Sequence, residues 1–266
     1  MRFDANLSIL FPDVPLLERP SAAAKAGFEA VELWWPFDDA VPAAGEADEL
    51  VDALGSAGVR LVLLNLWLGD RNAGQHGLLS SSAQDPRFLA NVEAVADIVS
   101  RLGGSIVNSH VGNVRPGEDL FAVRERAVAG LAIAAPRIAE AGATLVVEAL
   151  NPGDFPRYAL HRTADAVALA ERASEAAGTR VGILFDAYHV QLTEGDLFGP
   201  LAAAGQSIAH VQVADVPGRR RPGSGTIDFD RLFTALDGLG YAGWIGLEHL
   251  PSADPADTFA WLAEAR

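Results

Sequence analysis

Four polar side chains interrupt successive apolar runs in the second half of the chain. They are Glu148, Asp186, Gln212 and Glu248, each within or directly after such a run. An unpaired charge in this position is costly, and three carboxylates that converge repel one another. A divalent cation resolves both problems, because Mg²⁺ and Mn²⁺ prefer oxygen ligands. The four residues therefore predict an oxygen-rich metal site, in which Gln212 binds through its amide oxygen and adds no charge.

Each of these residues also has a plainer interpretation. A single acid at the end of a strand is more often a solvated loop residue or the partner of an arginine. Taken one at a time, His189 and His210 are typical of core histidines, and the run Arg219–Arg221 is typical of a solvated loop. The tryptophans either fill the top of the fold or form a substrate wall: Trp34, Trp35 and Trp67. Four candidate ligands on successive runs favour a site over these separate explanations.

The elements that must position these residues are eight short apolar runs, most of them followed by an alanine-rich amphipathic stretch. Several runs are nearly continuous in Val, Ile and Leu, as parallel strands covered by helices are. They are Phe3–Leu10, Ala30–Trp35, Val59–Leu66, Ser105–Gly112, Ala143–Leu150, Val181–His189, Ile208–Asp215 and Gly243–Leu250. Eight alternations in 266 residues predict one (β/α)8 TIM barrel domain over residues 1–266. The rival, an open doubly wound sheet, lacks its glycine-rich fingerprint.

The expected helices lie between these runs. They include Asp85–Leu102, Leu120–Ala141, Thr163–Ala177 and Phe229–Leu239. Three glycines follow helical stretches where a left-handed cap belongs: Gly27, Gly142 and Gly240. Thr163 and Asp228 are expected as N-caps.

Chemistry in a TIM barrel takes place at the C-terminal ends of the strands, so the polar residues there are the candidates. The first four runs supply mainly amides and one histidine: Asn6, Glu32, Asn65, Asn108 and His110. The last four add the predicted ligands together with Asn151, His189, His210, Asp215 and His249.

The composition of the chain limits the classes of partner that we expect it to bind. The net charge of −15 repels nucleic acid and anionic membranes, so we expect neither as a partner. No cysteine is present, which excludes thiol nucleophiles and zinc–thiolate sites. The sequence shows no signal peptide and no apolar run long enough to span a bilayer, and we expect a cytoplasmic protein. A small-molecule substrate is expected, and a homo-oligomer is compatible with the sequence.

A family resemblance adds to this interpretation. The stretches "ANLSILF", "NLWLGDRNAGQHG", "VEALN", "FDAYHVQLTEGD", "HVQVADVPGR", "PGSGTIDF" and "GYAGWIGLEHLP" together resemble hydroxypyruvate isomerases, members of the xylose isomerase-like barrel superfamily. The resemblance spans essentially the whole chain. It implies that Glu148, Asp186, Gln212 and Glu248 are the ligands of Mg²⁺ or Mn²⁺. It also implies that Glu148 and Glu248 are the catalytic acid–base pair.

The resemblance further implies where the substrate binds. His189 lies near metal and substrate, and His110, Asn65 and Trp67 complete the expected pocket. The substrate carboxylate needs a cationic donor, which Arg157 or one of Arg219–Arg221 can supply.

The implied reaction interconverts hydroxypyruvate and tartronate semialdehyde through an enediolate. The chain departs from the family pattern at Arg220, Thr226, His249 and Leu250, which we expect around the pocket and which leave the substrate open. The alternatives are a 3-epimerase or isomerase of a larger sugar or sugar acid, and a non-catalytic barrel that binds a metabolite. Because ketose 3-epimerases usually carry histidine where this chain has Gln212, the isomerase is favoured.

Overall fold

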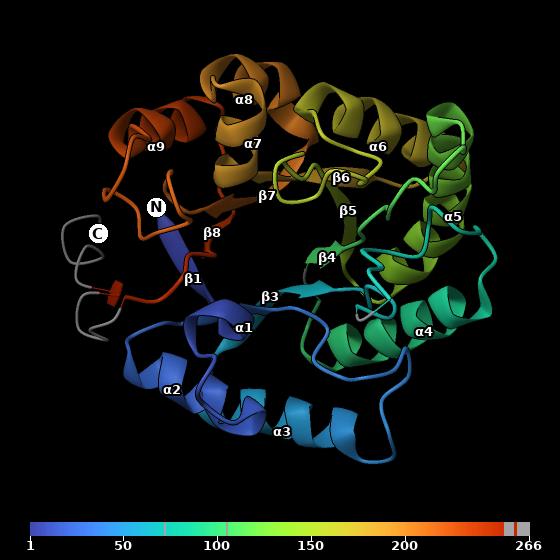
Figure 1. Ribbon diagram of the computed structural model, residues 1–266. Coiled ribbons are helices and arrows are strands. Elements are labelled where there is room, and N and C mark those ends of the chain that lie inside the picture. The colour runs from blue at the N-terminus through green and yellow to red at the C-terminus, as the bar shows by residue number, and fades with distance from the viewer. Residues whose placement is uncertain (72, 105, 253–257, 260–266) are drawn as a thin grey trace.

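Eight parallel strands follow one another around a closed barrel, and helices surround it (Figure 1). The computed structural model describes residues 1–71, 73–104, 106–252 and 258–259. The strands are β1 (Arg2–Asn6), β2 (Ala30–Leu33), β3 (Arg60–Asn65), β4 (Ile106–Asn108), β5 (Thr144–Glu148), β6 (Val181–Asp186), β7 (Ile208–Val213) and β8 (Trp244–Leu247). Strand β1 pairs with both β2 and β8, which closes the ring and confirms the predicted TIM barrel.

The α-helices of the described residues run over the outside of the barrel or follow strand ends. They are α1 (Leu7–Leu10), α2 (Arg19–Lys25), α3 (Glu46–Ala57), α4 (Pro86–Arg101), α5 (Leu120–Glu140), α6 (Thr163–Ala177), α7 (Ala187–Glu194), α8 (Phe198–Ala204) and α9 (Phe229–Gly238). Two short 3-10 turns join them, η1 (Leu16–Glu18) and η2 (Gly205–Ser207). Among the described residues, no helix combines the length and the apolar character needed to cross a membrane.

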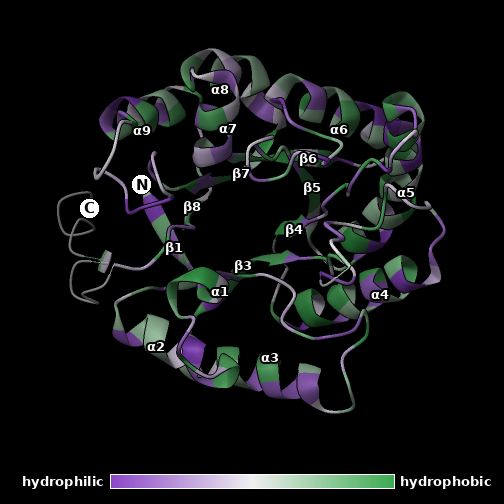
Figure 2. Cartoon of the chain, viewed as in Figure 1, coloured by the Kyte–Doolittle hydropathy of each residue, from purple (hydrophilic) through white to green (hydrophobic). Residues whose placement is uncertain are grey.

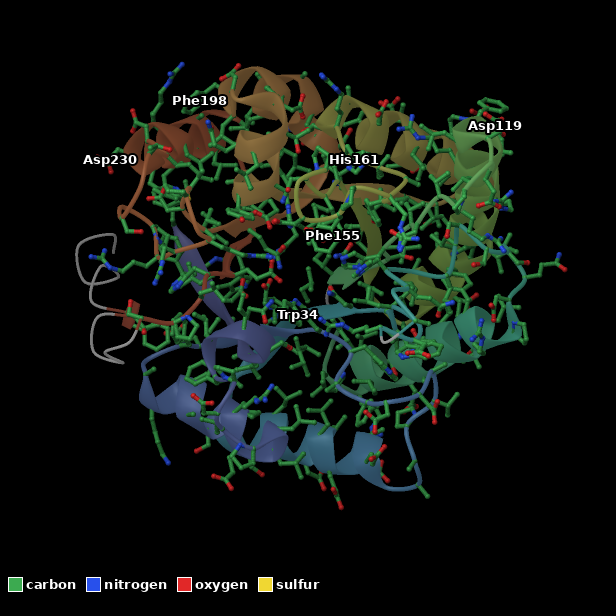
Figure 3. The ribbon with its side chains drawn as sticks, viewed as in Figure 1. Trp34, Asp119, Phe155, His161, Phe198 and Asp230 are labelled. Carbon is green, nitrogen blue, oxygen red and sulfur yellow. The ribbon has the colours of Figure 1, made fainter. Side chains whose placement is uncertain are left out.

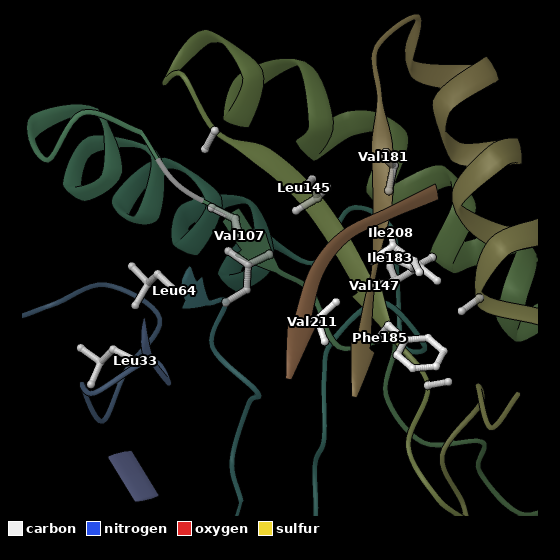
Figure 4. Packing of buried hydrophobic residues seen from close by; sticks show 14 of the residues in the cluster. Leu33, Leu64, Val107, Leu145, Val147, Val181, Ile183, Phe185, Ile208 and Val211 are labelled. Atoms are coloured by element: carbon white, nitrogen blue, oxygen red, sulfur yellow. The ribbon is translucent and has the colours of Figure 1, made fainter. Parts of the chain in front are cut away.

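The main core lies between the strands and the helices. One face of each strand packs outward against helices that alternate hydrophobic and hydrophilic residues (Figure 2). Figure 4 shows part of this packing, with side chains such as Val107, Val147 and Val211 in one buried cluster. Among the described residues, a small apolar cluster separate from this core consists of Leu63, Val146 and Leu184, with Ile106 and Ala209 packed against it.

Each of the eight predicted runs contains a strand, but every strand ends before its run does, and two of the runs continue directly as helices. Residues Leu7–Leu10 form helix α1, because the side chain of Asn6 accepts hydrogen bonds from the backbone of Ser8 and Ile9. The run of β6 likewise turns into helix α7 after Asp186, whose carboxylate accepts from the backbone N–H of Tyr188. Ser105, the expected start of the fourth run, lies outside the described residues.

The expected helix ends are confirmed at three glycines and one cap. Gly27, Gly142 and Gly240 have φ values of 89°, 79° and 72°, a region that favours glycine. Asp228 caps α9 by accepting from the backbone of Arg231.

The expectation for Thr163 was wrong. Arg162 is the N-cap residue of α6 and makes no side-chain capping bond. Thr163 instead donates both its N–H and its hydroxyl to Glu194 Oε1, at 2.9 and 2.8 Å. A carboxylate from α7 thus takes the place of a local cap.

Candidate active site at the barrel mouth

Side chains from the C-terminal strand ends and the loops beyond them line a cavity of about 100 Å³. Figure 3 labels Trp34 and Phe155, which lie near the middle of the ring of strands. The lining residues are Trp34, Asn65, Leu68, Arg71, His76, His110, Glu148, Leu150, Phe155, His189, Arg219 and Glu248. Both predicted catalytic glutamates therefore border one space.

Glu248 is held on both carboxylate oxygens. Its Oε1 accepts from Asn6 Nδ2 at 2.9 Å and from Trp34 Nε1 at 2.6 Å. Its Oε2 accepts from the guanidinium of Arg219. The side chain is buried, so these donors replace water and fix the orientation of the carboxylate.

Glu148, Asp186 and His189 form a second buried group with donor atoms within 4.8 Å of one another, and Glu148 and His189 line the same cavity. Asn108 Nδ2 donates to Glu148 Oε2 at 2.8 Å. His189 Nε2 lies 3.6 Å from Asp186 Oδ2 and 4.0 Å from Glu148 Oε1. His110 Nε2 lies 3.4 Å from Glu148 Oε2. Two histidines and an amide thus surround the acids.

Arg219 is the cation of the site. It lies in the loop after β7 with a positive φ of 54°, and its Nε donates to the backbone oxygen of Glu248 at 3.0 Å. Its guanidinium approaches Asp186 Oδ2 at 3.5 Å and lies over the ring of Tyr188 at 5.2 Å. Burial lowers the pKa of Arg219, but the surrounding carboxylates outweigh this and raise it. Arg219 therefore remains charged.

The environment shifts the pKa of each acid upward. Burial is the main cause in all three: it raises the pKa of Glu248 to about 7 and that of Asp186 to about 6, although Arg219 opposes both shifts. Burial and the charges of Glu248 and Asp186 raise the pKa of Glu148 well above its usual value. Burial lowers the pKa of His110 to about 3 and also lowers that of His189. The histidines are therefore neutral, and the excess negative charge is only partly compensated.

Two orphaned oxygens indicate how the remaining charge can be met. Asp186 Oδ2 and Gln212 Oε1 are buried and have no hydrogen-bond partner among the described residues. The two residues are register partners on β6 and β7. Gln212 Nε2 donates to Glu32 Oε1 at 2.6 Å, which fixes the amide so that its oxygen stays available. Buried oxygens without donors beside partly compensated carboxylates fit a divalent metal ion.

Comparison with known proteins now identifies the family. Residues 20–265 match the family described as Xylose isomerase-like TIM barrel. The chain belongs to this family. The putative hydroxypyruvate isomerase of Streptomyces coelicolor is 42% identical over 98% of this chain and 95% of its own length. The 2-oxo-tetronate isomerase of Cupriavidus necator is 33% identical, covering 98% of this chain and 97% of that protein.

A solved structure gives the same result in three dimensions. The crystal structure titled AP endonuclease, family 2, from Brucella melitensis superimposes with a TM-score of 0.90. It is 33% identical and covers 100% of this chain and 99% of that chain. This structure supports the barrel fold, and the curated relatives identify the chain as an enzyme of the isomerase class.

Among the predicted substrate residues, the structure places four in the cavity and two elsewhere. Asn65, His110, His189 and Arg219 line the cavity. Trp67 lines a neighbouring groove with Trp34, and its ring packs near the guanidinium of Arg87. Arg157 is exposed and is not among the lining residues.

The departures from the family pattern also lie outside the cavity lining. Thr226 and Leu250 are exposed, whereas His249 is fully buried with its Nδ1 beside the backbone oxygen of Leu250. Arg220 pairs with Asp215 through the backbone. We expected these four positions around the pocket, but none of them lines the cavity.

Sequence reasoning missed several cavity residues that come from loops. Arg71 and His76 lie in the "GDRNAGQHG" segment after β3, and Phe155 lies in the loop after β5. The available signal was a glycine-containing loop at the catalytic end of a strand, which carries both an arginine and a histidine. Trp34 was expected either to fill the top of the barrel or to form a substrate wall, yet its indole N–H donates directly to Glu248.

Proposed function

We propose that this chain is a metal-dependent isomerase that interconverts hydroxypyruvate and tartronate semialdehyde. The observation that carries the proposal is the pair of buried glutamates from β5 and the end of β8, Glu148 and Glu248, which border one cavity. A relative with 42% identity that is named putative hydroxypyruvate isomerase supports the same reaction.

The reaction moves one proton between two carbons and a second proton between their oxygens. In hydroxypyruvate a proton leaves C3, the C2 carbonyl becomes part of an enediolate, and a proton is returned to C2. The C3 hydroxyl loses its proton to give the aldehyde, and the C2 oxygen gains one to give the hydroxyl. One glutamate of the pair Glu148 and Glu248 takes the first proton, and the other delivers the second. General acid–base assistance of this kind is worth about 10²–10⁴-fold.

Four residues would hold the metal: Glu148, Asp186, Gln212 and Glu248. Their oxygens suit Mg²⁺ or Mn²⁺. When bound, the ion supplies positive charge that stabilises the developing enediolate. Arg219 holds the carboxylates of Glu248 and Asp186 in place, so that the site stays assembled around its charges.

The substrate carboxylate requires a second cation. Arg71 lines the cavity and lies over the ring of Trp34 at 5.9 Å, at an exposed position from which it can reach an anion. We assign the carboxylate to Arg71 or Arg219 rather than to Arg157. His110, His189 and Asn65 contact the substrate oxygens as neutral partners. The net charge of −15 supports a small substrate over nucleic acid or membrane, and we expect a cytoplasmic location.

The second candidate substrate is a four-carbon sugar acid, which the relative named 2-oxo-tetronate isomerase favours. The two substrates share the reacting atoms and differ in one carbon unit, which must fit beside Phe155 and Leu68. A larger ketose is a weaker candidate, because the cavity is small.

Initial rates separate the candidates. Purified protein is assayed with hydroxypyruvate, 2-oxo-tetronate and a ketose, with and without Mn²⁺. We expect turnover of hydroxypyruvate that depends on Mn²⁺. A much higher kcat/KM for 2-oxo-tetronate would move the assignment to the second candidate. Binding without turnover of any of them would instead support the non-catalytic barrel.

A further inference from the structure

A second acid–histidine cluster lies inside the barrel, outside the lining of the substrate cavity. It consists of Asp4 on β1, Glu32 on β2 and His210 on β7. Their exposed fractions are 0%, 0% and 2%. One donor atom from each residue lies within 4.8 Å of the other two. Three strands that are distant in sequence therefore bring metal-ligating groups to one sealed point.

Glu32 is held from several sides. His210 Nε2 lies 2.9 Å from Glu32 Oε2, and Glu32 Oε1 accepts from Asn6 Nδ2 at 2.8 Å and Gln212 Nε2 at 2.6 Å. Gly246 on β8 provides the room, since a Cβ there would stand 2.3 Å from Glu32 Oε2. The barrel is thus built around this carboxylate.

Asp4 contrasts sharply with Glu32. Both of its carboxylate oxygens are buried and have no hydrogen-bond partner among the described residues. A buried carboxylate without donors is costly, because folding removes its water without replacing it. Burial, together with the charges of Glu32 and Glu248, raises the pKa of Asp4 well above its usual value. Either a proton or a cation bound beside both oxygens can meet this cost.

We propose that Asp4, Glu32 and His210 hold a divalent cation that is distinct from the catalytic metal. Two carboxylates and one divalent ion sum to zero charge, which suits a sealed interior. An imidazole beside two carboxylates favours Zn²⁺ over Mg²⁺, whereas the all-oxygen set at the barrel mouth favours Mg²⁺ or Mn²⁺. The two sites therefore differ in the ion that they select.

One member of the cluster, His210, borders a second cavity. His210 lines a cavity of about 270 Å³ together with Arg2, Arg60 and Trp244, residues that stand at or next to the starts of strands. This is the end of the barrel opposite the substrate cavity. Asn6 connects the two levels, since its Nδ2 donates to both Glu32 and Glu248.

Metal analysis of the full chain tests the proposal. The protein is produced with Zn²⁺ and Mg²⁺ present, dialysed against excess Mg²⁺, and its zinc content is measured by mass spectrometry. We expect one zinc per chain in the wild type. Asp186→Asn, the matched control at the barrel mouth, should keep its zinc, whereas Asp4→Ala should lower the retained zinc at least about 10-fold. No retained zinc in the wild type, or unchanged zinc in Asp4→Ala, overturns the proposal.

Two measurements keep the test decisive if Asp4→Ala does not fold. Asp4→Asn preserves the volume of the side chain and removes its charge, and it should also lose zinc. Anomalous diffraction at the zinc edge from wild-type crystals locates the ion without any variant. A peak between Asp4, Glu32 and His210 supports the proposal, and a peak only between Glu148 and Asp186 contradicts it. Neither result depends on the reaction that the enzyme catalyses.

Discussion

Two clusters of acids and histidine lie in one barrel and differ chiefly in access. The upper cluster is Glu148, Asp186 and His189. Glu148 and His189 line the cavity at the barrel mouth with Glu248, and Asp186 lies beside the guanidinium of Arg219. The lower cluster, Asp4, Glu32 and His210, is sealed between strands, and no arginine pairs with its carboxylates among the salt bridges of the described residues.

The difference shows how one set of residue types serves two purposes. At the strand ends, loops bring Arg71, His76 and Arg219 over the acids, so the charges face a space that a substrate can enter. In the lower cluster, the inward-facing side chains of the strands lie within packed protein. There a charge can only be satisfied by a fixed partner, and turnover is excluded by lack of access.

The largest expected contrast between the clusters concerns chelation. EDTA should remove the metal of the upper cluster and lower kcat at least about 10³-fold, because a metal that stabilises charge is worth several kcal/mol. Mg²⁺ or Mn²⁺ should restore the rate, as measured by initial-rate assays. Zinc in the sealed lower cluster should survive the same treatment. Full activity in a sample verified to be free of metal would remove the metal from the mechanism.

Glu248→Gln should have the next largest effect. Glutamine keeps an oxygen for the metal and removes the base, so kcat should fall at least about 10²-fold while most metal binding remains. Glu148→Gln should behave alike. Glu93→Gln is the matched control, since Glu93 is exposed and only pairs with Arg137 at the surface. Turnover like that of the wild type in either active-site variant, with metal bound, would exclude the two-glutamate mechanism.

Gln212 connects the two clusters, and its substitution should mainly affect metal affinity. Gln212→Ala should weaken Mn²⁺ binding roughly 10-fold in calorimetry, because a neutral oxygen ligand is lost. Gln212→His should retain binding through its imidazole. Gln206→Ala, on the surface, controls for the loss of an amide. An unchanged affinity in Gln212→Ala would show that the residue is not a ligand.

The smallest expected effect is a pH dependence of stability in the metal-free protein. Asp186 and Glu248 have folded-state pKa values raised to about 6 and about 7, so the folded chain binds protons that the unfolded chain has released. This stability is present below the unfolded pKa values and is lost as the pH rises through the folded ones. Thermal scans should therefore show a Tm that falls between about pH 5 and about pH 8. Mn²⁺ should raise Tm more at the higher pH, because fewer protons then compete with the ion for the carboxylates. An equal gain in Tm at both ends of this pH range would contradict the raised pKa values.

The barrel could be predicted because eight mainly apolar runs alternate with helical stretches along the chain. The same property hid the ends of β1 and β6. An apolar run does not distinguish a strand from the helix that follows it, and the capping contacts of Asn6 and Asp186 decide the boundary. Thr163 was misjudged because its partner, Glu194, comes from another helix.

The candidate site was predictable to the extent that it lies on strands. Glu148, Asp186, Gln212 and Glu248 all project from the same ends, as the alternation predicts. Arg71 and Phe155 were missed because loop conformation, rather than strand periodicity, brings them to the cavity. The lower cluster could not be predicted from the sequence, because the strand register of the closed barrel brings Asp4, Glu32 and His210 together.

Solvent exchange tests the central claim, proton transfer between two carbons by Glu148 and Glu248, most directly. Hydroxypyruvate is incubated in D₂O with Mn²⁺-loaded protein, quenched and demetallated, and followed by NMR. The wild type should place deuterium at C3 of hydroxypyruvate and at C2 of tartronate semialdehyde. One glutamine variant should still exchange the proton at C3 without forming product, and the other should do neither. Product formation in either variant at the wild-type rate, or wild-type product without deuterium at C2, would contradict the account.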